Sequence, residues 1–217
     1  MSYLTREDAI LAIKKMKSFH DDLESVMNKN GFKLTENLGR RNILLSSAQE
    51  KYFADVLSAN YTTKVDGRTG EPDIFIEDLQ KELECKLTSP HRSGTIAFQT
   101  DFETLSKKGK LDYLYVVADE KFKKFAVIHY NDLCIEDFRP LSNGSRGKTQ
   151  MKKYKAHDRA NILLGDMISI NQRELDKLKL KLEKASTPAQ IKKIKKSIDY
   201  WSTTPTKFKF DMEEVCA

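Results

Sequence analysis

Residues 81–87 alternate between charged and apolar side chains, and this alternation constrains the fold more than any other feature of the sequence. The apolar members, which share one face, are Leu83, Cys85 and Leu87. The charged members on the opposite face are Glu82, Glu84 and Lys86. A period of two residues indicates a β-strand with one buried face. We therefore expect a strand that lies on a hydrophobic core and presents charge on its other side.

Further strands are expected on both sides of this one. Asp73–Ile76 is a short apolar run and Glu77–Gln80 turns the chain back, so residues 73–87 should form an antiparallel hairpin. Residues 113–118 are apolar and bounded by charges, which is typical of a buried strand. The remaining β-prone segments are residues 62–65 and 124–129.

Two helices are expected before these strands. Apolar residues recur at helical spacing over residues 6–29. A second helix is expected over residues 46–59, with Ser46 or Ser47 as its N-cap. Glu50 then stands at capping-box spacing after Ser47, so its carboxylate is expected to cap this helix.

A third helix is expected over residues 98–107. From residue 46 onward the order is therefore helix, three strands, helix and two strands, which predicts an α/β domain with a central mixed sheet flanked by helices. Residues 138–158 are rich in Gly, Ser, Asn and basic residues and should form a long surface loop. Residues 171–202 carry two apolar stripes at helical spacing, separated by Thr187-Pro188, and predict a helical hairpin.

Basic charge is concentrated in the C-terminal third of the chain. Residues 146–217 contain 17 Lys and Arg against nine Asp and Glu, whereas the preceding residues contain 21 and 23. Clustered positive charge attracts nucleic acid through its phosphates. A solvated, lysine-rich surface has the same composition, so charge alone leaves both interpretations open.

Several classes of protein are excluded or disfavoured by composition. No apolar run approaches the length of a membrane span, and no secretory signal precedes residue 10. The three cysteines are widely spaced, which indicates a reducing cytoplasm without structural zinc or a disulfide framework. No phosphate-binding GxxxxGK[ST] loop is present, so no nucleotide cofactor or ATP-driven motor is expected.

Asp73, Glu84 and Lys86 are the residues that we expect to carry chemistry. Glu84 and Lys86 lie two apart on one strand and project side by side, and the hairpin brings Asp73 to the same edge. Adjacent carboxylates form a hard oxygen site for Mg²⁺, and a neighbouring lysine can orient water and offset charge on a phosphoryl transition state.

This signal has two competing explanations. The chain contains one other acid-x-Lys triplet, Asp119-Glu120-Lys121, which has no paired acidic residue before it and should be an exposed turn. Glu84 and Lys86 could alternatively form a solvent-facing ion pair. The catalytic interpretation is favoured because Pro72-Asp73 lies on its own strand directly upstream.

The chain resembles the PD-(D/E)xK nuclease superfamily, and within it the type II restriction endonucleases. The resemblance consists of Pro72-Asp73 followed by Glu84-x-Lys86, in the element order helix, three strands, helix and strand. The resemblance covers about residues 45–130 and implies a restriction-endonuclease-like core. It implies that Asp73, Glu84 and the backbone carbonyl of Cys85 hold Mg²⁺, with Lys86 near the attacking water. Some relatives add an acid from the preceding helix, matched here by Glu50, and a glutamine from the next helix, matched by Gln99.

Contacts to DNA are expected in two loops. Arg92 and Ser93, directly after the catalytic strand, suit phosphate contact, although an ordinary polar connector would look the same. Residues 143–153 carry side chains suited to bases and phosphates, as would a flexible basic loop. The candidates there are Asn143, Arg146, Lys148, Gln150, Lys152 and Lys153.

Taken together, these features predict a Mg²⁺-dependent type II restriction endonuclease that cleaves duplex DNA at a specific sequence. A structure-specific or repair nuclease of the same superfamily, or a DNA-binding protein without activity, are the alternatives. We expect one domain over residues 1–217, in which residues 138–217 bind DNA or another copy of the chain. A homodimer in a prokaryotic or phage-infected cytoplasm, without membrane contact, is the expected setting.

Overall fold

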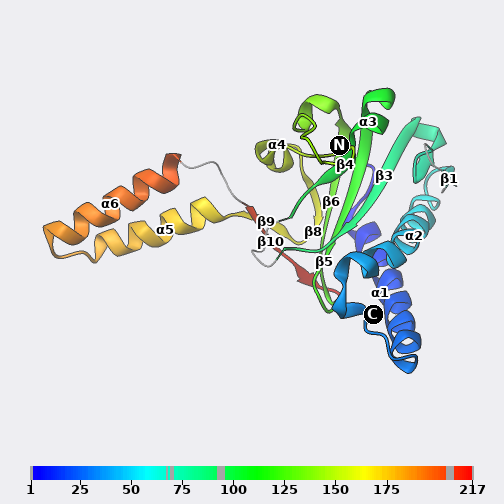
Figure 1. The fold of residues 1–217 in the computed structure, drawn as a ribbon, viewed down its shortest axis with the longest axis horizontal. Coiled ribbons are helices and arrows are strands. Elements are labelled where there is room, and N and C mark those ends of the chain that lie inside the picture. Colours follow the sequence, from blue (N-terminus) through cyan, green and yellow to red (C-terminus); the bar gives the residue numbers. More distant parts are fainter. Residues whose placement is uncertain (1, 67, 69–70, 92–95, 204–207, 217) are drawn as a thin grey trace.

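A mixed β-sheet organises the chain, with helices packed on one face and mixed elements on the other (Figure 1). The structure, a computed structural model, describes residues 2–66, 68, 71–91, 96–203 and 208–216. The strand order is β1-β2-β3-β5-β6-β11, and β8 also pairs with β6. Their bounds are β1 Thr63–Val65, β2 Ile74–Ile76, β3 Lys81–Thr88, β5 Leu111–Ala118, β6 Lys124–Leu133, β8 Asn161–Leu164 and β11 Glu213–Glu214.

The β3–β5 pair is parallel, whereas the other neighbours in this sheet are antiparallel. The sheet is therefore mixed and helices flank it, so the predicted α/β class is confirmed. The helical turns that link its elements are η1 Leu34–Glu36, η2 Glu77–Leu79 and η3 Ile135–Asp137. Among the described residues, no helix is both long and apolar enough to cross a membrane.

Helices α1 (Arg6–Lys29) and α2 (Leu38–Leu57) cover one face of the sheet (Figure 1). The first is confirmed as predicted, and Thr5 caps it in a reciprocal capping box with Asp8. Their buried apolar residues form a core with the inner side chains of β3 and β5, including Leu83, Cys85 and Leu114. The predicted inward face of the strand over residues 81–87 is thus confirmed.

The predicted start of the second helix was wrong. Helix α2 begins at Leu38 rather than near residue 46, because Asn37 is its N-cap and its side chain accepts a 3.0 Å hydrogen bond from the Arg40 N–H. Ser46 lies inside the helix, where its hydroxyl donates to the carbonyl of Ile43 at 2.8 Å. Glu50 therefore has no capping-box role.

The other face of the sheet carries small elements around a second core. These elements are β4 Gln99–Asp101, α3 Phe102–Lys108, β7 Lys148–Gln150, α4 Lys153–Asp158, β9 Asp166–Ser169 and β10 Phe208–Asp211. Strand β4 pairs with β7, and β9 pairs with β10. Phe98 lies at the centre of this core, with its ring edge-on to Tyr115, Tyr130 and Phe210.

Two sequence predictions on this face require correction. The helix expected over residues 98–107 begins at Phe102, because Asp101 caps it through a 2.9 Å hydrogen bond from the Thr104 N–H. The long loop expected over residues 138–158 contains strand β7 and helix α4. It is held in the core by buried Phe138 and Met151, which form an antiparallel bridge.

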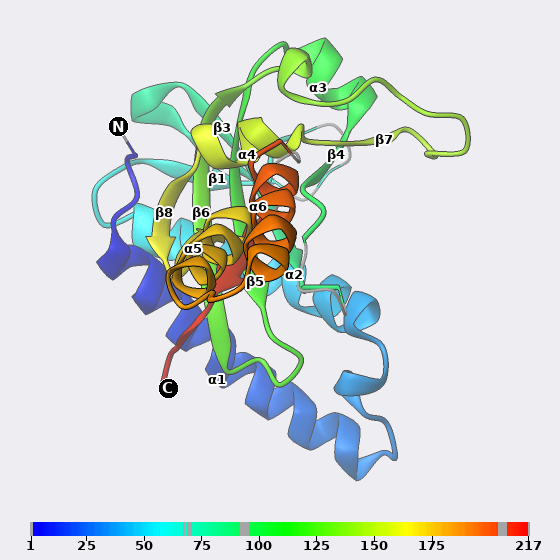
Figure 2. The same cartoon turned by 90° about the vertical axis from the view of Figure 1, so that its left-hand side faces the viewer.

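Helices α5 (Ile170–Glu183) and α6 (Pro188–Thr203) form the predicted hairpin. They project from the body as an arm, on the side of the sheet opposite to α1 and α2, and point toward the viewer in Figure 2. The two apolar stripes face each other and are only half-buried. Their members are Leu175, Leu178, Leu182, Ile191, Ile194, Ile198 and Trp201.

Candidate active site

The hairpin of β2 and β3 positions the three predicted catalytic residues. Ile74 pairs with Leu83 in an antiparallel register, so the continuation by one residue sets Asp73 opposite Glu84. Gln80 adopts a left-handed conformation at φ 50° and closes the turn between the strands. Glu84 and Lys86 project from the face of β3 opposite to buried Leu83, because side chains alternate along a strand.

Lys86 bridges the two carboxylates of the site. Its Nζ lies 2.8 Å from Glu84 Oε2 and 3.8 Å from Asp73 Oδ2. The Glu84 side chain is only 14% exposed to solvent, so Glu84 and Lys86 do not form the solvent-facing ion pair considered above. The other acid-x-Lys triplet, in contrast, lies in a turn where Glu120 and Lys121 are exposed. The two triplets therefore differ as expected, since Glu84 is largely buried whereas Glu120 and Lys121 are exposed.

Asp73 is held in place by the main chain of the neighbouring strand. Its Oδ2 accepts a 2.7 Å hydrogen bond from the Cys85 N–H. The pairing of β2 with β3 ends at Ile74 and Leu83, so Cys85 lies past the last paired residue of β3. The N–H and C=O of one strand residue point to the same side. The carbonyl oxygen of Cys85 therefore points toward Asp73 as well, while the Cys85 thiol is buried in the core below.

The charges of the site are mutually dependent. Burial raises the pKa of Glu84, with a further contribution from Asp73, while the charge of Lys86 opposes this rise. Burial also acts to lower the pKa of Lys86, but the carboxylates of Glu84 and Asp73 outweigh it and raise that pKa above its usual value. Lys86 is consequently a cation at neutral pH and acts as a fixed positive charge.

Glu50 extends the acidic cluster from the middle of helix α2. Burial raises the pKa of Glu50, and the charges of Asp73 and Glu84 raise it further while Lys86 opposes them. The charge of Glu50 is therefore coupled to the charges of the other three residues. Glu50 lies on α2, the helix before these strands, where the family resemblance implies an acid.

The oxygen donors of the site suit a divalent cation. Asp73, Glu84 and the Cys85 carbonyl offer hard oxygen atoms, which Mg²⁺ prefers over nitrogen or sulfur. The bridging position of Lys86 Nζ shows that the carboxylates already stabilise positive charge between them. The residues present therefore fit Mg²⁺, whereas the carboxylate oxygens of Glu50, Asp73 and Glu84 do not all lie within 4.8 Å of one another.

Strand β5 supplies two residues that the sequence prediction missed. In the parallel register Tyr113 lies beside Glu84 and Tyr115 beside Lys86. The Tyr115 hydroxyl donates to the carbonyl of Gln99 at 2.9 Å, and the hydroxyls of Tyr113 and Thr100 hydrogen-bond at 2.7 Å. Hydroxyls at alternate positions of an otherwise apolar strand were the signal for these contacts.

The predicted DNA contacts fall into three groups. Four of the predicted residues line one polar hollow of about 530 Å³ beside the β4–β7 pair; they are Gln99, Arg146, Lys148 and Gln150. Gln99 lies on strand β4 and not on the helix that the resemblance implied. Arg92 and Ser93 lie outside the described residues.

The remaining predicted contacts are not among the residues that line that hollow. Asn143 is exposed in the turn before β7, and Lys153 is exposed at the start of α4. Lys152 is half-buried, and its Nζ donates to the carbonyl of Glu136 at 2.6 Å, which ties α4 to the preceding helical turn. Of these three residues, Lys152 thus has a structural contact that the sequence did not predict.

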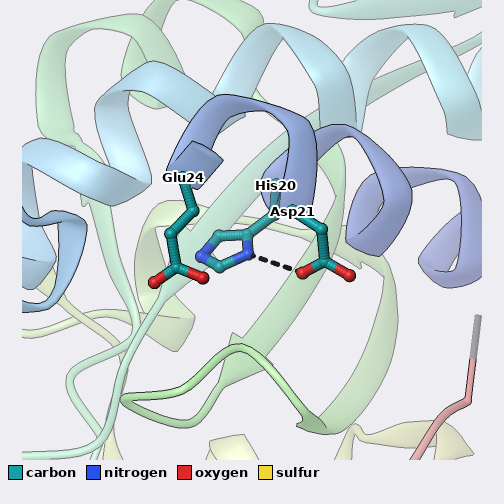
Figure 3. A group of neighbouring side chains, drawn as sticks. All are labelled: His20, Asp21 and Glu24. Atoms are coloured by element: carbon teal, nitrogen blue, oxygen red, sulfur yellow. Dashed lines mark hydrogen bonds and ion pairs between the residues drawn. The ribbon is translucent and has the colours of Figure 1, made fainter. Parts of the chain in front are cut away.

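A second cluster of possible metal ligands lies on helix α1 (Figure 3). His20 Nδ1 lies 3.2 Å from Asp21, and Glu24 stands on the other side of the ring. The ring is buried and stacks on Phe122 at 4.6 Å, while the Arg41 guanidinium lies 5.0 Å from the same Phe122 ring. Burial lowers the pKa of His20. These contacts describe a packed histidine that joins α1 to the turn before β6.

Comparisons of the chain with protein-family models, with curated proteins and with solved structures found no match. The functional assignment therefore depends on the geometry of the site and on the residues that form it.

Proposed function

We propose that the chain is a Mg²⁺-dependent type II restriction endonuclease that hydrolyses duplex DNA at a specific sequence, with a restriction-endonuclease-like core over about residues 45–130. The observation that carries the proposal is the bridge from Lys86 to Asp73 and Glu84 on the β2–β3 hairpin of a mixed sheet. Two carboxylates, a carbonyl oxygen and a lysine within one hairpin form the set that phosphodiester hydrolysis requires.

Each residue has a distinct role in this proposal. Asp73, Glu84 and the Cys85 carbonyl hold Mg²⁺, which when bound polarises the scissile phosphate and activates water. Lys86 orients that water and offsets negative charge as the phosphate becomes pentavalent. Glu50 adds negative charge behind the site and strengthens its preference for a divalent cation.

Substrate binding in this proposal depends on the basic C-terminal third. Clustered cations contact phosphates, while side chains near β4 and β7 contact the bases. We further propose that the endonuclease acts as a homodimer, because a two-fold dimer matches a palindromic site.

The proposal is tested by incubation of the purified chain with unmethylated phage DNA and Mg²⁺, followed by gel electrophoresis. Discrete, reproducible bands that disappear when EDTA replaces Mg²⁺ are expected. A smear would show that the chain cleaves DNA non-specifically or by DNA structure, and would contradict cleavage at a specific sequence. Intact DNA over several substrates would contradict the nuclease assignment.

A further inference from the structure

Strands β4 and β7 form a two-stranded ribbon with one exposed polar face. Thr100 and Thr149 are paired and buried, whereas the flanking residues on both strands are exposed. Gln99 stands directly opposite Gln150, and Asp101 stands opposite Lys148. Among the residues that the structure describes, neither glutamine amide has a hydrogen-bond partner. Two free amides therefore lie next to each other on one surface.

The ribbon is fixed to the body by hydrogen bonds on both strands. The Tyr115 hydroxyl holds the carbonyl of Gln99, and the Arg139 N–H donates to the carbonyl of Gln150 at 2.9 Å. The Met151 N–H also donates to the carbonyl of Phe98 at 2.8 Å. The backbone that carries the two amides is thus preorganised, which reduces the entropy cost when they bind a ligand.

The ribbon lies beside the proposed catalytic residues. Lys86, Gln99 and Lys148 line a common hollow of about 300 Å³, and Tyr115, which anchors Gln99, is the strand neighbour of Lys86. A duplex whose phosphate reaches Lys86 would therefore present bases to the ribbon.

The side chains on this face suit the base edges in the major groove of DNA. That groove accepts a two-stranded ribbon, and a glutamine amide can pair with both N6 and N7 of adenine. We propose that the β4–β7 ribbon enters the major groove and that Gln99 and Gln150 each recognise one adenine of the target sequence. This inference rests on the proposed function, since it specifies which DNA the endonuclease selects.

The test uses a pool of DNA duplexes with a randomised central segment. The full chain selects bound duplexes in Ca²⁺ and cleaved duplexes in Mg²⁺, and both fractions are sequenced. The variants are Gln99→Glu and Gln150→Glu, with Asn28→Asp at an exposed position of α1 as a control of equal charge. Gln99→Ala and Gln150→Ala repeat the test without added charge, and thermal melts verify that each variant folds.

The wild type should favour adenine at two fixed positions by roughly ten-fold or more over other bases. Each Glu variant should lose the preference at one position and gain cytosine there, because a carboxylate accepts from cytosine N4. Asn28→Asp should keep the wild-type preference. Selection without adenine, or an adenine preference unchanged in all four ribbon variants, would overturn the inference.

The two assays separate this inference from the proposed function. Cleavage without any adenine preference overturns recognition by the ribbon but supports the nuclease. Adenine-selective binding without cleavage supports the ribbon and overturns the nuclease. A chain that neither binds nor cleaves any duplex overturns both.

Discussion

The Cys85 N–H donates a 2.7 Å hydrogen bond to the carboxylate of Asp73. The side chain of Asp73 thus takes the place of a main-chain acceptor where the pairing of β2 with β3 ends. The bond ties Asp73 to the strand that carries Glu84 and Lys86. Catalytic groups need such support because small displacements cost large factors in rate. In the proposed function Asp73 therefore has both a structural and a chemical role, and two substitutions can separate them.

Asp73→Asn should abolish cleavage while it leaves the fold intact, because an amide oxygen can still accept the bond from Cys85. Asp73→Ala should also lower the free energy of unfolding by about 1–3 kcal/mol, since it leaves a buried N–H unpaired. Urea titrations of both variants give the comparison. Equal stability of the two variants would show that the hydrogen bond contributes nothing.

Glu50→Gln should reduce cleavage on the order of 10–100-fold, as is typical for residues that support a metal site. It should also stabilise the chain without Mg²⁺ at neutral pH. Because the folded pKa of Glu50 is raised, its ionisation above the ordinary value of 4.5 opposes folding, and this cost vanishes below that pH. Urea titrations across pH 4–8 test it, with exposed Glu36→Gln as control. Lower stability of Glu50→Gln at pH 7 would contradict the prediction.

His129 should make the fold sensitive to acid. Burial, aided by the charge of Lys81, lowers its pKa from 6.5 to about 4. Between these values the unfolded chain binds a proton that the folded chain does not, so stability falls as pH falls, by roughly 3 kcal/mol in total. His129→Phe should flatten this decline in urea titrations, whereas exposed His91→Gln should not. An unchanged pH profile in His129→Phe would refute the assignment.

The arm of α5 and α6 should bind DNA phosphates. Helix α6 carries four exposed lysines, at positions 192, 193, 195 and 196, and replacement of all four by Gln should weaken DNA binding in Ca²⁺. The slope of log affinity against log salt should fall by about 0.9 for each phosphate that the variant no longer neutralises. Replacement of exposed Lys14, Lys15, Lys29 and Lys33 removes equal charge from the other face. Identical slopes for the two variants would exclude a specific role of the arm.

The sequence predicted the hairpin of β2 and β3 because its signals are local. Alternation over residues 81–87 determines which side chains share a face, and the tight turn sets the register that brings Asp73 opposite Glu84. The parallel partner β5 was not predicted as such, because that pairing depends on a crossover between distant residues. Tyr113 and Tyr115 could therefore be assigned to a buried strand but not to the site.

The errors of prediction arose where short polar signals compete. Ser46 and Ser47 resemble an N-cap, but Asn37 caps the helix earlier and the serines lie within it. Strands β4 and β7 are only three residues long, and the sequence predicted a helix at β4 and a loop at β7. Their pairing with each other is a long-range contact, and periodicity does not reveal it.

The most direct test of the account is the single-turnover rate of duplex cleavage in Mg²⁺ for Glu84→Gln and Lys86→Ala. The matched control is Lys121→Ala, which alters the other acid-x-Lys triplet of the chain. We predict that both site variants fold but cleave at least roughly 10²-fold more slowly, while the control cleaves at the wild-type rate. Wild-type rates in both site variants would show that the hairpin of β2 and β3 is not the catalytic centre.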